Sequence, residues 1–387
     1  MTIISSKVLL AYAAQCSPSE LLIDQDYLHR INILCSAINA SARLNIKGRK
    51  LIFRQLADAI VNYSDTKRIV RDNPEVLAEK IKRPILLAGL PRTGSTFLQR
   101  LLSLDPDNRY LNFEEGLKPC VEITDGDGAQ QRSDFSHRWA NVMHGHLPAV
   151  QSMITLQPDF PVECNFLKRN SLLCDSWCFQ LDLQELREYW YHPDSQTTKY
   201  QLYLRQLQIL QYRSAAAERW VLKSPTHHPV IDSLDTVFEQ PLIINTRRNL
   251  DEVVPSLINL VYALRKGFSD HIELSSVRDE VLEFLKNQIA CNQTARKKMP
   301  DSHLIDIDYP DLIQDPQAVI EHIYARFNLD FTNEYQGNIE SWLQLQPQSS
   351  YKPKSYRYNL RSLGFSVVDI HQYFDSCFDS GQLVADC

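Results

Sequence analysis

The sequence predicts a single-domain α/β protein in which a phosphate-loop-like parallel β-sheet is flanked by helices and preceded by a helical extension. Three observations predict this class. Within an expected α/β core over residues 81–330, short apolar runs alternate with stretches of helical periodicity, as in a parallel sheet. Two glycines, five residues apart, follow the first of these runs. Residues 18–80 carry helical periodicity alone.

Composition narrows the class of protein. At 387 residues the length allows two or three domains but is also compatible with one large α/β domain, and the net charge of −6 argues against a protein dedicated to nucleic acid. Nine cysteines are scattered without a C-x-x-C pair; Cys174 and Cys178, at helical spacing, have no second pair to complete a metal site. We therefore expect reduced, mostly buried thiols in a cytoplasmic protein. Nothing in the sequence specifies an oligomeric state.

The N-terminal part, residues 1–80, is expected to be a helical extension packed on the core. Its one early apolar run, Val8–Ala14, is too short for a membrane anchor and too weakly charged to favour a signal peptide. The residues Ser17–Glu20 resemble a helix start. Apolar residues at helical spacing continue from there to Val61, and nothing in this part suggests chemistry.

The stretch around residues 83–100 is the most informative in the chain. Ile85–Ala88 is a short apolar run, which predicts a buried strand of a parallel sheet. Gly89 and Gly94 bracket a tight turn, and leucines at helical spacing then predict a helix to about Leu104. Strand, glycine turn and helix form the context in which backbone N–H groups bind a phosphate.

This turn nearly matches the phosphate-loop pattern G-x-x-x-x-G-K-[ST]. Thr96 fills the hydroxyl position, but Ser95 stands where the pattern has lysine, and the cation within the loop is Arg92. That lysine binds the outer phosphates of ATP or GTP and offsets their negative charge. The loop is therefore expected to bind a phosphate-like anion other than a nucleoside triphosphate with Mg²⁺.

Carboxylates follow the next predicted strand. Tyr110–Phe113 is expected to be a strand, with Glu114 and Glu115 at its carboxyl end, where ligands bind in open α/β sheets. Residues 115–195 are irregular and aromatic, which suits a lid or an acceptor pocket. Within them, Asp159 and Glu163 either serve a turn and a helix start or contact an acceptor.

Basic residues follow the remaining strands. Lys223 comes after the run 220–222, Arg247 and Arg248 follow the run 242–245, and Ser256 lies near the start of the helix expected over 250–265. Another strand is expected at 304–307, and helices are expected over 200–218 and 312–327. Cations gathered at strand ends of an acidic protein indicate a polyanion site. A second phosphate at Ser256 predicts a nucleotide phosphorylated at both ends.

The C-terminal part, residues 331–387, contains a polar and basic tail at 346–364 before a last helix expected over Val367–Cys377. Lys354 and Arg357 are the cations of the tail that we single out. By itself, this tail is typical of a surface loop.

Three ordered motifs, PILLAGLPRTGSTFLQRLL, LKSPTHH and IINTRRNLDEVVPS, resemble the sulfotransferases that use 3′-phosphoadenosine 5′-phosphosulfate, in their stand-alone bacterial-type branch. The resemblance covers about residues 20–380. It implies that Arg92, Thr93, Gly94, Ser95 and Thr96 cradle the 5′-phosphosulfate. It also implies that the 3′-phosphate is bound by Ser256 and an arginine, Arg248 in preference to Arg247. The tail is similar to the family's basic loop over the cofactor, with Tyr356 where the branch often has histidine.

The reaction that this resemblance implies moves a sulfuryl group to a hydroxyl, or an amine, of a small-molecule acceptor, and requires no metal. Lys223 is the candidate for stabilising the charge on the leaving oxygen. The acceptor's proton requires a base, for which Glu114 is the first candidate and His227 the second; Glu115 stays open. The wider family uses both glutamate and histidine in this role.

Two alternatives belong to other classes. A phosphate-loop kinase or NTPase acting on a small metabolite is disfavoured by the missing lysine and by the lack of an evident acidic Mg²⁺ site. A non-catalytic nucleotide-binding protein would bind the donor without transferring its sulfuryl group to any acceptor.

Overall fold

The computed structural model describes residues 3–120, 127–151, 153, 154, 156–214, 217–345 and 360–377. The chain divides into two compact units, and each unit is assembled from separate segments. The first comprises Met1–Lys80, Asn112–Ala215 and Leu260–Ile272, and the second comprises Ile81–Leu111, Ala216–Asn259 and Glu273–Cys387.

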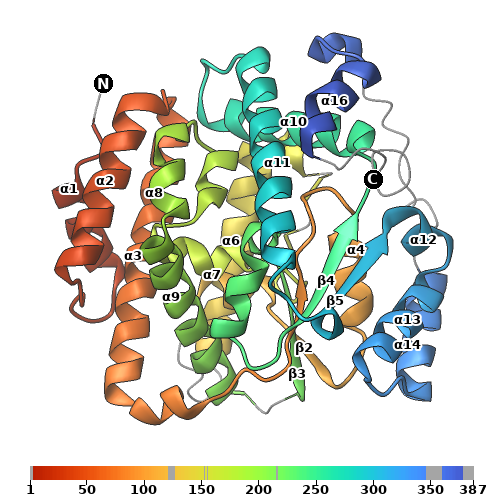
Figure 1. The fold of residues 1–387 in the computed structure, drawn as a ribbon. Helices are drawn as coiled ribbons and strands as arrows, with labels where there is room; N and C mark the ends of the chain where they lie inside the picture. The colour runs from red at the N-terminus through yellow and green to blue at the C-terminus, as the bar shows by residue number, and fades with distance from the viewer. Residues whose placement is uncertain are drawn as a thin grey trace. The chain divides into compact units, whose positions relative to one another are not determined.

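The first unit is helical in its described part (Figure 1). Its α-helices are α1 (Ser6–Cys16), α2 (Gln25–Ser41), α3 (Ile46–Asp72), α5 (Phe113–Leu117), α6 (Asp127–His146), α7 (Asn165–Lys168), α8 (Arg187–Tyr191) and α9 (Pro193–Tyr212). Short 3₁₀ turns lie at Pro74–Ala78, Pro148–Val150, Arg169–Ser171, Asp175–Phe179 and Gln184–Leu186. The long helix predicted over 200–218 therefore begins and ends several residues earlier.

Helices α2 and α3 of the extension begin at side-chain caps. The Asp24 carboxylate accepts the N–H of Tyr27 at 2.8 Å and begins α2, and Asn45 accepts the N–H of Gly48 at 2.7 Å and begins α3. The helix start predicted at Ser17–Glu20 is wrong: α1 ends at Cys16, and the next helix begins at Gln25. The helix begins after Asp24, whose carboxylate caps it, and not after Ser17.

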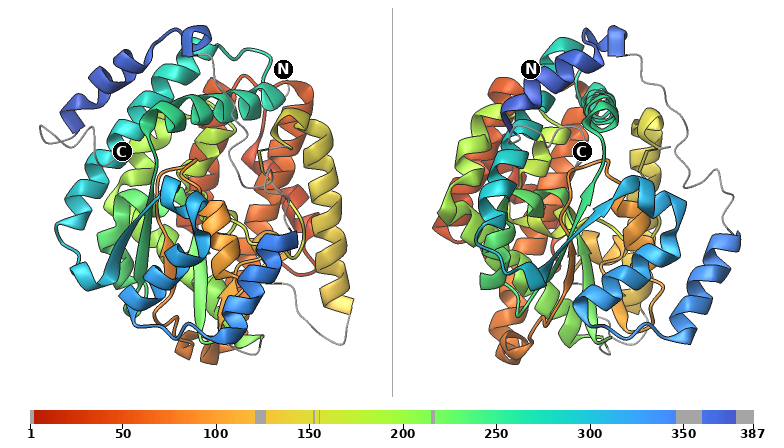
Figure 2. Two further views of the ribbon diagram at one scale, coloured as in Figure 1. Left: turned by 90° about the vertical axis from the view of Figure 1, so that its right-hand side faces the viewer. Right: turned by 45° about the vertical axis from the view of Figure 1, so that its right-hand side comes forward.

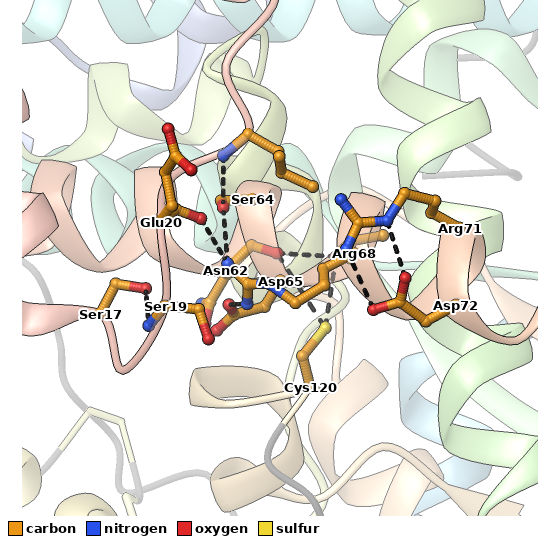
Figure 3. A network of polar contacts seen from close by, with 12 residues as sticks. Ser17, Ser19, Glu20, Asn62, Ser64, Asp65, Arg68, Arg71, Asp72 and Cys120 are labelled. Carbon is orange, nitrogen blue, oxygen red and sulfur yellow. Dashed lines mark hydrogen bonds and ion pairs between the residues drawn. The ribbon is translucent and has the colours of Figure 1, made fainter.

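Helix α3 holds the preceding residues through the polar contacts drawn in Figure 3. The Leu22 N–H donates to Ser64 Oγ at 2.9 Å, and Arg68 donates to the Glu20 carbonyl at 2.6 Å and to Asp65 Oδ1 at 2.5 Å. The ring of Tyr27 in α2 also stacks on the ring of Tyr63 in α3, with the ring centroids 3.6 Å apart. These contacts tie the chain between α1 and α2 to α3.

The second unit contains a parallel sheet of five strands in the order β2-β3-β1-β4-β5. The strands are β1 (Ile85–Leu87), β2 (Asn108–Tyr110), β3 (Arg219–Lys223), β4 (Leu242–Arg247) and β5 (Leu304–Asp308). Because β1 is central and β3 and β4 flank it, the segments that follow these three strands meet at one edge of the sheet. The wholly apolar β1 is buried along its length, as predicted for a strand covered on both faces.

The helices of the second unit are α4 (Ser95–Leu102), α11 (Leu274–Arg296), α12 (Tyr309–Gln314), α13 (Pro316–Phe327), α14 (Asn333–Leu345) and α16 (Val367–Phe374); α10 (Leu250–Phe268) begins in it. A 3₁₀ segment covers Pro225–Thr236. The helix predicted over 312–327 is two helices, since Asp315 ends α12 and caps α13 by accepting the N–H of Ala318. No described helix is long and apolar enough to cross a membrane.

The C-terminal helix α16 lies along α11 (Figure 2). Lys286 lies over the Tyr373 ring at 5.2 Å, and Gln293 donates to the Cys377 carbonyl at 2.7 Å. Near the start of α10, His371 Nε2 lies 3.0 Å from Asp251 Oδ1. The segment after the tail is thus packed against the two helices that follow β4.

Candidate functional site

The turn after β1 has the backbone of an anion-binding loop. Gly94 lies in the left-handed region, with φ of 87°, and Arg92 lies there too, with φ of 72°. The Gly94 carbonyl accepts the N–H groups of Phe97 and Leu98, so the helix bonds of α4 start there and the earlier N–H groups lie outside them. The Thr96 side chain beside them is exposed. This arrangement suits a phosphate group at the start of α4.

The loop is braced against β4 by Thr93. Its Oγ1 donates to the Leu90 carbonyl at 2.6 Å and lies 2.6 Å from Thr246 Oγ1, and its side chain is buried. Gly89 packs so closely on the same residue that a Cβ would lie 2.1 Å from Thr246 Oγ1. The Thr93 hydroxyl therefore supports the loop from within, which leaves its backbone as the part available to an anion.

Three residues predicted from the sequence, Arg92, Arg248 and Ser256, are linked by hydrogen bonds at this loop. Arg92 Nε donates to Ser256 Oγ at 3.0 Å, and Arg248 donates through an NH1 hydrogen to the Arg92 carbonyl at 3.2 Å. The glycine loop and the start of α10 are consequently joined by direct hydrogen bonds. These two elements are more than 150 residues apart in sequence.

The two neighbouring arginines have different surroundings. Arg247 forms a bidentate pair with Asp308, at 2.9 and 2.7 Å, because the register of β4 and β5 places the two residues opposite each other. Arg248 instead lies over the Tyr309 ring, at 4.1 Å, and contacts the loop. Arg248 is thus the arginine positioned at the glycine turn.

Lys223 ends β3 and reaches the same turn. Its Nζ donates to Thr96 Oγ1 at 3.2 Å, and its side chain is 5% exposed. Its backbone pairs with Leu87 at the end of β1. A cation held in a partly water-excluded position beside the loop hydroxyl is placed to stabilise negative charge that develops there.

The SPTHH segment after Lys223 is buried. Ser224 caps the following 3₁₀ turn by accepting the Thr226 N–H at 3.2 Å. The His227 side chain is fully buried. Burial lowers the pKa of His228 to about 4, so its ring is neutral at pH 7, and its Nδ1 lies 2.7 Å from the Ala88 carbonyl. Both histidines are therefore enclosed in the second unit.

The predicted base carboxylates lie in the first unit. The strand expected at Tyr110–Phe113 is wrong: β2 ends at Tyr110, and Glu114 and Glu115 lie in the short helix α5. Glu115 is buried and completes a capping box with Asn112, each accepting the other's backbone N–H. Its carboxylate is therefore committed to holding the helix.

Glu114 is only partly buried. Burial raises its pKa; Arg132 and His137 oppose this effect, while Glu115 and Asp159 reinforce it. Glu114 combines solvent access with a raised pKa, and both properties suit a general base.

Aromatic side chains pack beside this helix. Phe113, Trp139 and Phe166 form an edge-on cluster with ring centroids 5.5–6.0 Å apart. Trp139 and Phe166 are partly exposed. The two further acids singled out in this region differ: Asp159 is exposed, and Glu163 accepts a hydrogen bond from Asn165 at 2.9 Å.

Comparison with known proteins identifies the family. The model described as "Sulfotransferase family" matches residues 84–333, which is more than half of the chain. The chain belongs to the sulfotransferase family.

Two solved structures share its fold. Sulfotransferase STF1 from Mycobacterium tuberculosis H37Rv is 24% identical with a TM-score of 0.82, and the match covers 97% of this chain and 99% of that one. Sulfotransferase STF9 from Mycobacterium avium is 22% identical with a TM-score of 0.81, covering 97% and 96%. At these identities the likeness establishes the sulfotransferase fold. No curated protein shows a significant match.

The tail cations, a metal site and the cysteines were also considered from the sequence of this sulfotransferase. The tail cations Lys354 and Arg357 lie outside the described residues. Within the part of the chain that the structure describes, no group of three or more His, Cys, Asp or Glu residues is arranged to hold a metal ion. The eight cysteines among these residues are free thiols.

Sequence reasoning missed three residues at the site: Asp308, Tyr309 and Glu252. Two signals were available. Asp308 and Tyr309 directly follow the run 304–307, the position at which the other functional residues were sought. Glu252 follows Arg248 by four residues, the spacing of an ion pair on a helix, and the two side chains do pair, at 3.0 Å.

Proposed function

We propose that this sulfotransferase moves a sulfuryl group from 3′-phosphoadenosine 5′-phosphosulfate to a hydroxyl, or less readily an amine, of a small-molecule acceptor. The observation that carries the proposal is the joining of two anion-binding elements through Arg92, Ser256 and Arg248. A loop without the phosphate-loop lysine suits a 5′-phosphosulfate, and an arginine beside a helix start suits a 3′-phosphate.

The residues proposed to hold the donor divide by element. The backbone of the loop and the Ser95 and Thr96 hydroxyls bind the 5′-phosphosulfate, while Arg248 and Ser256 bind the 3′-phosphate. Arg92 links the loop residues to the residues proposed for the 3′-phosphate through its hydrogen bond to Ser256. Arg247, which is paired with Asp308, is proposed to act mainly by holding β4 and β5 in register. Lys354 and Arg357 are proposed to contribute positive charge over the donor.

When bound, the donor supplies a sulfuryl group attached to a phosphate leaving group. Lys223, held at the loop by Thr96, is proposed to stabilise the negative charge that develops on the bridging oxygen as that bond breaks. The chain's cations supply this stabilisation, so the proposed mechanism uses no metal.

Glu114 is proposed to take the proton from the acceptor. Its raised pKa makes it a stronger base than an exposed glutamate, and its carboxylate keeps access to solvent. His227 stays the second candidate although it is fully buried, and Glu115 is the third because its carboxylate caps α5. The partly exposed aromatic residues Trp139 and Phe166 of the first unit favour an acceptor with an apolar part. The free thiols favour a cytoplasmic setting.

A thermal-shift experiment tests the donor. Adenosine 3′,5′-bisphosphate at about 100 times its dissociation constant should stabilise the protein by roughly 2.7 kcal/mol, whereas ATP with Mg²⁺ should give a much smaller shift. The Arg248→Gln variant should lose most of the bisphosphate shift. An acceptor screen with sulfur-labelled donor then tests turnover. A larger shift with ATP and Mg²⁺, accompanied by ATP turnover, would favour a kinase instead.

A further inference from the structure

The Arg248 guanidinium is held by three different partners. Its Nε and NH2 donate to the two carboxylate oxygens of Glu252, at 3.1 and 3.0 Å. Its NH1 donates to the Arg92 carbonyl at 3.2 Å, and its Cζ lies 4.1 Å from the centre of the Tyr309 ring. The arginine proposed to bind the 3′-phosphate is therefore already paired with an acid, Glu252, from the first turn of α10.

Two of these partners are fixed in place. The Arg92 carbonyl belongs to the backbone of the loop. The Tyr309 ring packs so closely on Gly94 that a Cβ there would lie 2.6 Å from its Cδ2. A planar cation held against an aromatic face and a carbonyl keeps its orientation when its third partner leaves.

Glu252 is the partner that can leave. Its side chain is 51% exposed, and it pairs with Arg248, which is 17% exposed and precedes α10. A carboxylate this exposed gains little stability from such a pair and is easily exchanged. The neighbouring acid Asp251 faces His371 instead, with 3.0 Å between Oδ1 and Nε2.

We propose that Glu252 is an exchangeable counter-ion of Arg248 and thereby limits how strongly the site prefers a 3′-phosphorylated nucleotide; this inference rests on the proposed function. A nucleotide with a bare 3′-hydroxyl leaves the ion pair intact and gains nothing from Arg248. A 3′-phosphate displaces the Glu252 carboxylate and accepts the two hydrogen bonds that Arg248 donates to it. The ion pair between Arg248 and Glu252 is then lost, and the displaced carboxylate stays nearby and repels the phosphate.

Calorimetric binding of two nucleotides tests this exchange. Glu252→Gln should tighten adenosine 3′,5′-bisphosphate by roughly threefold to tenfold, since an exposed ion pair and its repulsion of the phosphate are removed. It should change the affinity for adenosine 5′-monophosphate by less than about twofold. Glu321→Gln is the matched control: this exposed glutamate of α13 accepts a hydrogen bond from Gln317, and its substitution should alter neither affinity.

A double-mutant cycle assigns the effect to Arg248. In an Arg248→Gln background, Glu252→Gln should no longer tighten the bisphosphate, because the pair that it relieves is absent. Unchanged or weakened bisphosphate binding in Glu252→Gln, or equal tightening of both nucleotides, would overturn the exchange while leaving the proposed donor standing. A wild-type protein that fails to bind the bisphosphate would instead overturn the proposed donor and the inference together.

Discussion

The close approach of the glycine loop to β4 makes Gly89→Ala the sharpest test of the fold around the site. A Cβ at this position would lie 2.1 Å from Thr246 Oγ1, 2.5 Å from its carbonyl oxygen and 2.7 Å from its backbone nitrogen. Two of these atoms belong to the strand itself. The contact can be relieved only by separating β1 from β4, which the Ala88 N–H joins to the Ile244 carbonyl at 2.9 Å.

We expect Gly89→Ala to destabilise the second unit by about 3 kcal/mol, at the upper end of the usual cost of overpacking. For a unit of this size the thermal midpoint should fall by about 6–12 °C. Gly337→Ala in α14 is the matched control, because a Cβ there meets nothing within 4 Å. It should stabilise the helix by roughly 0.5–1 kcal/mol. Thermal and urea unfolding measure the stability of both variants against wild type. A Gly89→Ala protein as stable as wild type would refute the reasoning.

Three further predictions concern the proposed chemistry and its support. Glu114→Gln should abolish turnover while bisphosphate affinity stays near wild type; because burial raises its pKa, wild-type turnover should increase with pH through that raised value. Turnover of the variant at the wild-type rate would remove Glu114 as base. Lys223→Ala should lower turnover by roughly 10²–10³-fold, as measured with saturating donor, and a loss confined to donor affinity would contradict its role. Asp306→Asn should cost about 2 kcal/mol at pH 7 in urea unfolding. Burial disfavours the Asp306 carboxylate, but hydrogen bonds from Arg296 and Asn245 hold its pKa below the usual value. Its stabilisation is therefore present above the unfolded pKa and lost as pH falls through the folded one, so a cost independent of pH would count against it.

The sequence was most informative where the evidence for an element is local. The apolar run of β1, the spacing of Gly89 and Gly94, and the absent lysine predicted the glycine loop, and the structure confirms its strand–turn–helix context. The parallel sheet was predicted for the same reason, since each strand is an apolar run between polar boundaries. The sulfotransferase family is confirmed by the match over residues 84–333, and the fold by the likeness to the two mycobacterial structures.

Errors arose where a cap outweighed an apolar pattern. The run Tyr110–Phe113 looks like a strand, yet Asn112 and Glu115 form a capping box that starts α5. The spacing of those two residues was visible in the sequence and would have predicted the helix. The roles of Glu114 and Glu115 differ because only Glu115 occupies the third helical position, from which a side chain reaches back to the cap.

Other features depend on tertiary pairing and could not be predicted locally. Arg247 and Arg248 are adjacent and identical in type, and only the register of β4 with β5 commits Arg247 to Asp308. The inward hydroxyl of Thr93 likewise depends on Thr246, more than 150 residues away in sequence. Pairs so distant leave no spacing pattern in a single sequence.

The most direct measurement of the central claim is a crystal structure of the protein with adenosine 3′,5′-bisphosphate. We predict the 5′-phosphate against the backbone at Gly94 and Ser95, and the 3′-phosphate within hydrogen-bonding distance of Arg248 and Ser256. A bisphosphate bound away from either element, or with its two phosphates exchanged between them, would contradict the proposed donor site.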